Sequence, residues 1–498
     1  MRRSIVFFPT TMLAFFLVAP LAGQVPLKLS TDKFTNSDST HKTEVEPASF
    51  AWGSTIVSAF HVARRPGSIG WGSADVGFST STNGGKTWKY GVLPGLTINY
   101  KNGTYGAAAD PSVAYDAKHG QWLISTLPLA GLNPQSGTIG DVAVSRSTDG
   151  LTWGNPIAID TTHLDDKNWT VCDNTTTSPF YGNCYTEWDD NGAGNRMEMS
   201  RSTDGGATWS VAATNSNGII GGQPVVRPDG TVIVPTANAN ETAIGAFNST
   251  NGGVSWSATT TIATVRHHTV AGSLREGPLP SAEIDSAGTV YVVWADSRFR
   301  SGGKVNDIVI IHSLNATGTS WSSVTRIPID TTGSGIDHFI PGLAVNKATS
   351  GATVQLGLTY YFYPKGTTQL SVGFTSSADA GSNWSTPQTM VSGMTSTWAA
   401  TTSQGRMVGD YISTSYGSDN LAHGIFGSAY TPTSGTSCSS VLDNCNAPID
   451  TFTPGLASGA TSGLNDQVLF AGNGNGNGNG DAQNFWNLVN NEGIQHRD

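Results

Sequence analysis

Short apolar segments come in pairs along most of this chain, and a turn rich in Gly, Asp or Asn separates the two members of each pair. Seven pairs can be laid out: 48–52 with 56–60, 111–115 with 122–125, 169–172 with 184–188, 224–226 with 231–234, 281–284 with 290–294, 341–345 with 354–358, and 411–414 with 424–427. Apolar runs of this length, bounded by turn residues, are typical of β-strands. The pattern therefore predicts a repeated unit of short antiparallel strands.

A segment that ends in tryptophan follows six of the seven pairs, and we call these six the turn segments. They are 81–88 (STNGGKTW), 147–153 (STDGLTW), 202–209 (STDGGATW), 249–256 (STNGGVSW), 313–321 (SLNATGTSW) and 377–384 (SADAGSNW). Asp or Asn can accept hydrogen bonds from the backbone that follows, Gly supplies a positive φ, and Trp gives the turn an apolar anchor. We expect tight hairpins in which Asp149, Asp204 and Asp379 form turns and do not take part in catalysis.

The tryptophans of the turn segments lie 47 to 65 residues apart, which is the length of one four-stranded sheet with its turns. On these segments the sequence resembles the Asp-box, or BNR-repeat, proteins, the group that includes the sialidases. The resemblance implies an all-β fold, a β-propeller of four-stranded antiparallel blades. We expect seven blades, with the strand at 25–29 completing the last one, or six if the first and last units combine.

Composition and length agree with one β-rich domain. The chain has 498 residues, with 60 Gly, 14 Trp and only 12% charged residues, so helix should be scarce. We assign 1–23 to a signal peptide, because two arginines precede a short apolar run and small residues follow it. Residues 24–470 are assigned to the propeller. Residues 471–498 are assigned to a Gly/Asn linker and tail.

The same features predict a secreted protein, extracellular or periplasmic, with no membrane anchor. Four cysteines fall into two close pairs, Cys172 with Cys184 and Cys438 with Cys445, which suits disulfides in an oxidising compartment. The net charge of -10 argues against nucleic acid as a partner. We expect a monomer that acts on a glycan or polysaccharide and needs no cofactor or metal.

Strand direction alternates within a blade, so the loops that enter first strands and leave second strands should share the face opposite the turn segments. Charged residues gather in these loops although the chain is poor in charge. The candidates from entering loops are Asp110, Asp165, Asp166, Lys167, Arg275, Glu276, Asp337, His338, Arg406 and Asp410, and those from leaving loops are His61, Arg64, Arg65, Glu187, Asp189, Asp190, Asp296 and Arg298. A ring of carboxylates and guanidiniums suits glycan chemistry, because carboxyl groups can protonate a leaving oxygen and arginine can hold an acidic sugar.

The resemblance also implies catalytic roles: three arginines on the substrate carboxylate, a tyrosine nucleophile assisted by a glutamate, and an aspartate as acid/base. Glu276 is then the candidate glutamate, Asp110 and Asp166 compete for the acid role, and Tyr361 is the first candidate tyrosine. Candidates for substrate binding are Arg64, Arg65, Arg275, Arg298, Arg406, His338 and Asp410. This chain departs from the family pattern, because its Arg-Ile-Pro sequence, 326–328, follows the fifth turn segment instead of preceding the first.

These observations favour a secreted, sialidase-like glycoside hydrolase that acts on terminal acidic sugars at the mouth opposite the turn segments. One alternative is a propeller without catalysis that binds a glycan or a protein at the same mouth. The other is a polysaccharide lyase, for which His61, His338 or the pair His267 and His268 would transfer protons.

Overall fold

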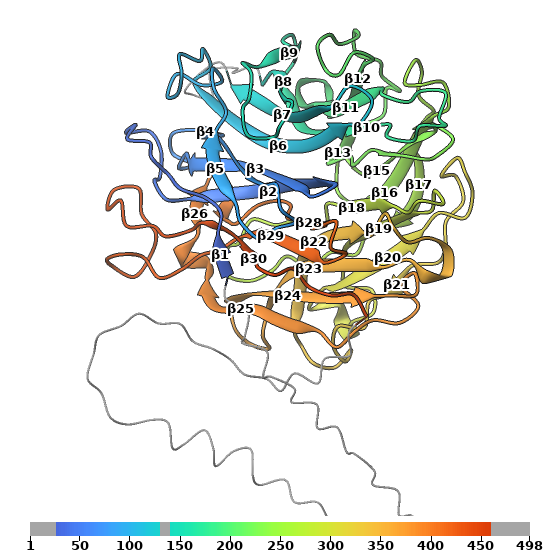
Figure 1. Ribbon diagram of the computed structural model, residues 1–498. Coiled ribbons are helices and arrows are strands. Elements are labelled where there is room, and N and C mark those ends of the chain that lie inside the picture. The colour runs from blue at the N-terminus through green and yellow to red at the C-terminus, as the bar shows by residue number, and fades with distance from the viewer. Residues whose placement is uncertain (1–25, 130–139, 460–498) are drawn as a thin grey trace, which may run out of the picture. The chain divides into compact units, whose positions relative to one another are not determined.

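The computed structural model of this chain describes residues 26–129 and 140–459 (Figure 1). The predicted signal peptide at 1–23 and the predicted tail at 471–498 lie outside the described residues. The described part is all-β. Its helical structure is limited to four 3-10 turns of three residues, η2 (Asn191–Ala193), η3 (Ser301–Gly303), η4 (Gly351–Thr353) and η5 (Ser396–Trp398).

The strands pair into antiparallel sheets in chain order. The first sheet contains β2 (Glu44–Trp52), β3 (Thr55–Arg64), β4 (Ser73–Ser81), β5 (Lys89–Val92), β6 (Ala107–Asp116), β7 (Gln121–Leu129), β8 (Val142–Ser147) and β9 (Ile157–Asp160). A smaller sheet contains β10 (Asp165–Cys172), β11 (Cys184–Asp190) and β12 (Arg196–Ser202). The next contains β13 (Ile219–Ile220), β14 (Val225–Val226), β15 (Val232–Asn238), β16 (Ala243–Ser249) and β17 (Thr260–Thr264).

The second half of the chain continues the pattern. Its sheets are β18 (Ser281–Ile284) with β19 (Val290–Asp296), β20 (Asp307–His312) and β21 (Thr325–Arg326), then β22 (Asp337–Val345) with β23 (Leu356–Tyr363), β24 (Gln369–Ser377) and β25 (Gln388–Thr395). A hairpin of β26 (Ala400–Thr402) and β27 (Gly405–Met407) precedes the last sheet, which contains β28 (Ser413–Tyr416), β29 (Ala422–Gly427), β30 (Ile449–Phe452) and β1 (Pro26–Lys28).

The first strands of these groups form a closed ring, which makes the fold a β-propeller. β2 contacts β6, and contacts continue in chain order through β10, β14, β18 and β22 to β28, which returns to β2. In Figure 1 the colours follow this course around the molecule, and the red strands β28–β30 return to the side of the blue strands β2 and β3. Apolar faces of neighbouring sheets pack together, as Val293 and Ile308 do with Phe339 and Leu358. Burying one such side chain contributes about 1.5–3 kcal/mol.

The prediction of seven or six blades is wrong, because the number of sheets in the structure is smaller. Within residues 26–129 and 140–459, five sheets have four or more strands. One reason is that the groups β2–β5 and β6–β9 join into one eight-stranded sheet through the pairing of Ser73 with Ala108. The other is that the segment after β12 makes isolated bridges, such as Met199 to Ala213, in place of a continuous fourth strand.

Strand β1 completes the last sheet as the sequence predicts. Pro26 pairs with Phe452 and Lys28 with Asp450, so the two ends of the described chain meet in one sheet. This pairing covers the edge of β30 that would otherwise be open. Both predicted disulfides are present: Cys172–Cys184 joins the neighbouring strands β10 and β11, and Cys438–Cys445 closes a short loop. Among the described residues, no helix has the length and apolar character needed to cross a membrane.

The turn segments have the expected hydrogen bonds. Asp204 Oδ1 accepts from the backbone N–H groups of Ala207 and Thr208, at 3.0 and 2.9 Å. The Trp209 indole donates to the Gly206 carbonyl at 3.2 Å. The first turn segment meets the turn after β2, because Gly84 N–H donates to Ser54 O at 2.8 Å. The turn segments therefore lie at the end of the sheets where first strands end and second strands begin.

Candidate functional site

Bulges near the starts of three first strands carry the charged residues at the centre of the site. The pairing register of β2, β6 and β10 shifts where Glu46, Asp110 and Lys167 lie, and these residues have positive φ values of 55°, 44° and 52°. Pro47 and Pro111 follow two of them, and proline is tolerated at a bulge because it has no N–H to donate to the ladder. A bulge re-aims its side chain, so three charged groups converge on the ring of first strands.

The ammonium group of Lys167 lies between three carboxylates. Its Nζ is 3.4 Å from Glu46 Oε1, 3.2 Å from Asp110 Oδ2 and 2.6 Å from Asp410 Oδ2. The Lys167 side chain is only 6% exposed. Arg275 adds a second cation, because its Nε donates to Asp410 Oδ1 at 2.8 Å and its Nη2 donates to the other oxygen.

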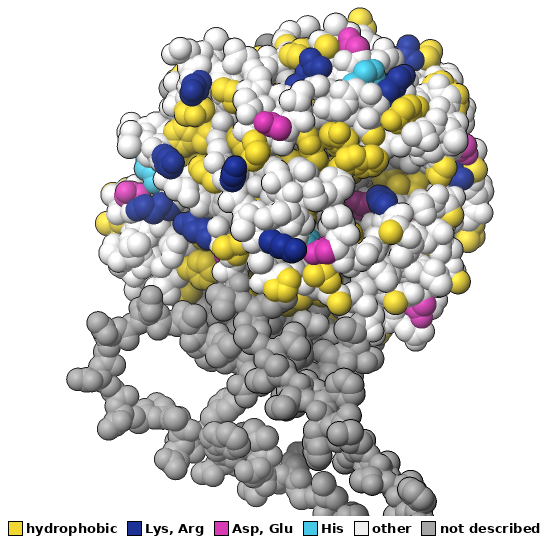
Figure 2. Space-filling view, viewed as in Figure 1, with side chains coloured by type: hydrophobic (Ala, Val, Ile, Leu, Met, Phe, Trp, Pro, Cys, Tyr) yellow, Lys and Arg dark blue, Asp and Glu magenta, His cyan; other side chains and the backbone are white. Residues whose placement is uncertain are grey.

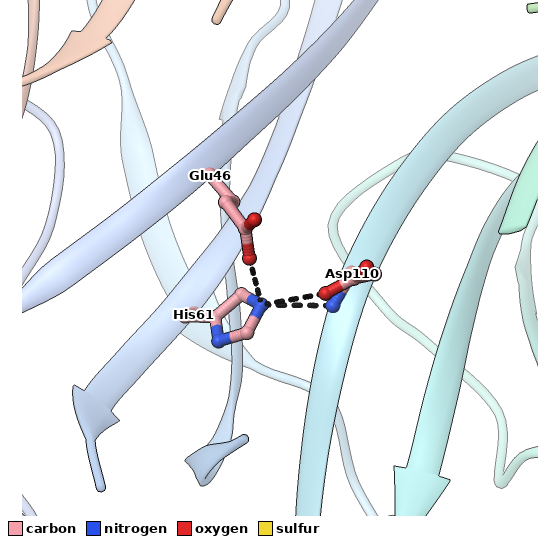
Figure 3. A group of neighbouring side chains, drawn as sticks. All are labelled: Glu46, His61 and Asp110. Carbon is pink, nitrogen blue, oxygen red and sulfur yellow. Dashed lines mark hydrogen bonds and ion pairs between the residues drawn. The ribbon is translucent and has the colours of Figure 1, made fainter. Parts of the chain in front are cut away.

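His61 on β3 joins the same carboxylates (Figure 3). Its Nε2 is 2.8 Å from Glu46 Oε2 and 3.5 Å from Asp110 Oδ1, and the Asp110 backbone N–H points to the same nitrogen at 2.8 Å. Burial disfavours a positive charge on the His61 imidazole, but the nearby Glu46 and Asp110 outweigh the effect of burial and raise the pKa of His61. We call Glu46, His61, Asp110, Lys167, Arg275 and Asp410 the axial cluster.

The cations of the axial cluster hold two of its acids in the ionised form. Burial alone would raise the pKa of Asp110, but Lys167 and His61 outweigh it and hold that pKa well below its usual value. Burial is likewise outweighed at Asp410, where Arg275 and Lys167 lower the pKa. The neighbouring Asp166 behaves differently: burial raises its pKa to about 6 although Lys167 favours its charge. Carboxyl groups in such unequal settings are typical of acid/base sites.

The axial cluster lies at the end of the sheets opposite the turn segments. Glu46, Asp110 and Lys167 are near the starts of their strands, whereas the turn segments meet the turns that follow those strands. This arrangement agrees with the prediction that the charged loops and the turn segments use opposite faces. On the face drawn in Figure 2, charged side chains are scattered among white and yellow ones. The axial cluster is largely buried, because the side chains of Lys167, Asp110 and Asp410 are only 6%, 8% and 9% exposed.

The loop between β17 and β18 places another acid, Glu276, and a histidine, His267, beside the axial cluster. Glu276 Oε2 lies 2.9 Å from His267 Nε2, and Glu276 Oε1 accepts from the Val270 backbone N–H at 3.2 Å. Burial opposes a charge on His267, but Glu276 outweighs it and raises the pKa of that ring. Next to this pair, burial raises the pKa of Asp337 to about 7. The loop is joined to the axial cluster by Arg275, the residue before Glu276.

Two cavities run along the ring of first strands. A small one of about 20 Å³, room for about one water molecule, touches Lys167, Asp410 and Tyr411. A cavity of 880 Å³ extends from there toward the turn segments, and Trp169 and Gln223 line both. The larger cavity reaches the turns at Gly53 and Asp285. Its size is that of a ligand site, but none of the residues of the axial cluster lines it.

The structure brings some of the predicted residues together and separates others. Asp110, Arg275 and Asp410 belong to the axial cluster, and Asp166 and Glu276 lie beside it. Arg64 is close enough for its charge to act on the cluster, and burial followed by Arg275 lowers its pKa to about 10.

The other predicted arginines have partners elsewhere. Arg65 donates to Asp38 Oδ2 at 2.6 Å and to the Gly106 carbonyl, and it is buried. Arg298 is paired with Asp296 at 2.8 Å. Arg406 donates to two backbone carbonyls, those of Ala399 and Cys438, at 2.9 and 3.0 Å. These three arginines therefore do not join Arg275 around one carboxylate.

Tyr361 and His338 lie inside the packed sheets. Tyr361 is fully buried and its hydroxyl donates to the Gly427 carbonyl at 2.5 Å. His338 is buried against Tyr360 and Phe362, and burial lowers its pKa to about 4. Glu46 is the member of the axial cluster that the sequence analysis missed. The available signal was the repeated pair of an acid and a proline, Glu46-Pro47 and Asp110-Pro111, at the start of two first strands.

No known family model matches this sequence. No curated protein sequence is detectably similar to it. Solved structures with a similar course of the chain include sialidases and other glycan-degrading propellers. The Hadza microbial sialidase Hz136 is 18% identical with a TM-score of 0.44, and the match covers 64% of this chain and 64% of that one. The match thus spans less than two thirds of the length of that sialidase.

Two further structures extend the comparison. An ulvan lyase is 10% identical with a TM-score of 0.48, covering 87% of this chain and 97% of that one. The NanB sialidase from Streptococcus pneumoniae is 13% identical with a TM-score of 0.41, covering 87% of this chain and 71% of that one. These similarities do not assign a substrate to this chain.

Proposed function

We propose that this protein is a secreted glycoside hydrolase that removes terminal acidic sugars from glycans, with its active site at the axial cluster. The observation that carries the proposal is the unequal setting of neighbouring carboxyl groups around Lys167. Asp110 and Asp410 contact cations and their side chains are 8% and 9% exposed, whereas the half-buried Asp166 forms no ion pair with any Lys, Arg or His of the described residues. Glycoside hydrolysis needs such a division, one carboxylate to stabilise positive charge and one carboxyl group to protonate the leaving oxygen.

In this proposal Asp166 is the acid, because burial raises its pKa to about 6, so that it can hold a proton near that pH. Arg275 recognises the acidic group of the sugar, since its side chain is 20% exposed although it also binds Asp410. Lys167 and His61 do not touch the substrate; they hold Asp110 and Glu46 in place. Because Arg65, Arg298 and Arg406 have other partners, recognition by three arginines is not part of the proposal. The proposal also includes the predicted signal peptide at 1–23 and the predicted extent of the propeller, 24–470.

The test is product formation from a panel of sialosides, uronic-acid glycans and neutral glycosides, followed by mass spectrometry. Asp166→Asn and Arg275→Gln should each remove most of the activity. The melting temperature should stay close to that of the wild type in Asp166→Asn and fall in Arg275→Gln, because Asp410 then loses a partner. Arg298→Gln is the matched control, because its guanidinium pairs with Asp296 away from the axial cluster. No product across the panel, or full activity in both variants, would refute the proposal. Saturable binding without product would instead indicate a propeller that binds glycans.

A polysaccharide lyase is the second candidate, and the hydrogen bond between His267 and Glu276 favours it. A histidine oriented by a carboxylate can remove a proton from a carbon atom, and the His267 side chain is 16% exposed. A lyase forms an unsaturated uronate, which absorbs in the ultraviolet and is absent after hydrolysis. His267→Gln should then abolish this absorbance, whereas a hydrolase would keep forming its saturated product.

A further inference from the structure

Three groups of carboxylates with a histidine bring their ligand atoms within 4.8 Å of one another in the described residues: Glu46 with His61 and Asp110, Asp307 with Asp330 and His338, and Asp160 with His163 and Asp165. The first group already holds the Lys167 ammonium. The second holds two guanidiniums, those of Arg300 and Arg326. No ion pair between a Lys or Arg and Asp160 or Asp165 occurs in the part of the chain that the structure describes, so the third group differs from the others.

The third group, Asp160 with His163 and Asp165, lies in the connection between two neighbouring sheets. Asp160 ends β9 and Asp165 begins β10, so the short connection between them brings both carboxylates to one place. Local hydrogen bonds fix the first: Asp160 Oδ2 accepts from the Thr162 backbone N–H at 3.0 Å and lies 3.0 Å from His163 Nδ1. The backbone fixes the second, because Asp165 N–H donates to Gly140 O at 3.0 Å.

Asp165 is a buried carboxyl group that accepts no hydrogen bond from the described residues. It is 5% exposed, and in that part of the chain neither of its side-chain oxygens has a donor within reach. Burial and the nearby Asp160 raise its pKa to about 9, and Asp190 and Asp141 add to the shift. The donors in the neighbourhood are engaged elsewhere, since Arg196 binds Asp190 and Glu198 while Tyr105 donates to Asp141. A buried carboxyl surrounded by carboxylates is unfavourable unless a proton or a cation compensates for the charge.

We propose that Asp160, His163 and Asp165 form a binding site for a divalent metal cation, a site that the sequence analysis did not expect. The two unpartnered oxygens of Asp165 provide the buried side of the site, and Asp160 and His163 provide the more exposed side, with side chains 14% and 35% exposed. Carboxylate oxygens with one imidazole nitrogen suit Mn²⁺ or Zn²⁺, and the oxygens without the ring suit Ca²⁺. The cation compensates for the buried carboxylate and fixes the start of β10, next to Asp166 and Lys167.

The experiment is calorimetric titration of the full chain, treated with EDTA and dialysed, with CaCl₂, MnCl₂ and ZnCl₂ in turn. At least one ion should bind with a stoichiometry near one and raise the melting temperature. Asp165→Asn and Asp160→Asn should each weaken that binding by at least about tenfold. His163→Gln identifies the ligand set: weaker Mn²⁺ or Zn²⁺ binding indicates coordination by the ring, and unchanged Ca²⁺ binding indicates a site built from oxygens.

Two controls keep the result interpretable. Asp330→Asn changes an equivalent group that already holds two arginines, so it should leave metal binding unchanged. Without metal, Asp165→Asn should melt no lower than the wild type, because it removes an uncompensated acid, and circular dichroism checks that it is folded. The proposal is overturned if none of the three ions binds stoichiometrically at millimolar concentration, or if Asp165→Asn and Asp160→Asn bind as the wild type does. These outcomes do not depend on enzymatic activity, so they are separate from the test of the proposed function.

Discussion

The Arg275 guanidinium binds the Asp410 carboxylate through two hydrogen bonds, although the two residues are 135 positions apart in the chain. Arg275 belongs to the loop before β18 and Asp410 to the segment before β28, so the contact joins two loops at the same end of the ring. Lys167 binds the same carboxylate from β10, which makes Asp410 the point where three parts of the ring meet.

The first prediction concerns the coupling of this pair. In urea unfolding of Arg275→Met, Asp410→Asn and the double variant, the two changes should be non-additive by about 1–3 kcal/mol, because each removes the partner of the other. The exposed pair Lys347 and Glu283, with side chains 51% and 28% exposed, is the control and should couple by about 0–1 kcal/mol. Additive effects of Arg275→Met and Asp410→Asn would show that the contact has no energetic role.

The second prediction is that Lys167→Met lowers the free energy of unfolding by about 3–5 kcal/mol, since it leaves buried carboxylates without their common cation. Glu46, Asp110 and Asp410 all lie within 3.4 Å of the ammonium that this change removes. Lys86→Met, at an exposed position of the first turn segment, should change stability by no more than about 0.5 kcal/mol. Denaturant unfolding measures both, and equal stability of Lys167→Met and wild type would contradict the role given to Lys167.

Local features of this fold could be predicted from the sequence, whereas the number of sheets could not. The Ser, Asp and Gly residues of a turn segment act on their own backbone, so 202–209 forms the predicted turn around Asp204. The sheet count depends on contacts between distant residues, such as Ser73 with Ala108, and on whether the segment after β12 pairs continuously. No short-range pattern encodes either of these.

The same distinction explains the candidate site. Topology placed Asp110, Asp166, Arg275 and Asp410 at one end of the ring, because it depends only on where loops enter strands. Topology alone could not identify Glu46, because the direction of its side chain is set by a bulge, with a φ of 55°, inside a strand. It also could not show that Tyr361, at the expected end of a second strand, points into the packed interior and donates to Gly427.

The third prediction concerns the turn segments. Asp204→Ala should lower the free energy of unfolding by about 1–2 kcal/mol, because it removes the acceptor of two backbone N–H groups. Asp204→Asn should cost less, since Asn83 and Asn251 occupy the corresponding position in other turn segments and accept similar bonds at 3.0 and 3.1 Å. Equal losses in the two variants would contradict the role of this oxygen as an acceptor.

The pH dependence of Asp204→Ala provides a second measurement. Burial slightly raises the pKa of Asp204, but hydrogen bonds from Thr208 and Ser202 outweigh it and lower the pKa to about 2. A carboxyl group with a lowered pKa in the folded state stabilises the protein above its ordinary pKa and loses this effect as the pH falls toward 2. The difference in stability between wild type and Asp204→Ala should therefore be smaller at pH 3 than at pH 6.

The fourth prediction uses Glu187 on β11, which is fully buried and has no hydrogen-bond partner on either carboxyl oxygen within residues 26–129 and 140–459. Burial raises its pKa well above the usual value, so the folded protein keeps the proton at a pH where the unfolded chain has released it. The unfolded state then binds fewer protons than the folded state. Glu187 therefore makes the free energy of unfolding fall as the pH rises above about 4.3, by up to about 1.4 kcal/mol per pH unit.

Glu187→Gln is neutral in both states and should remove this contribution. Its stability relative to the wild type should increase steadily from pH 5 to pH 8 in denaturant unfolding. A constant difference between Glu187→Gln and wild type over this range would mean that Glu187 ionises in the folded protein as it does in the unfolded chain.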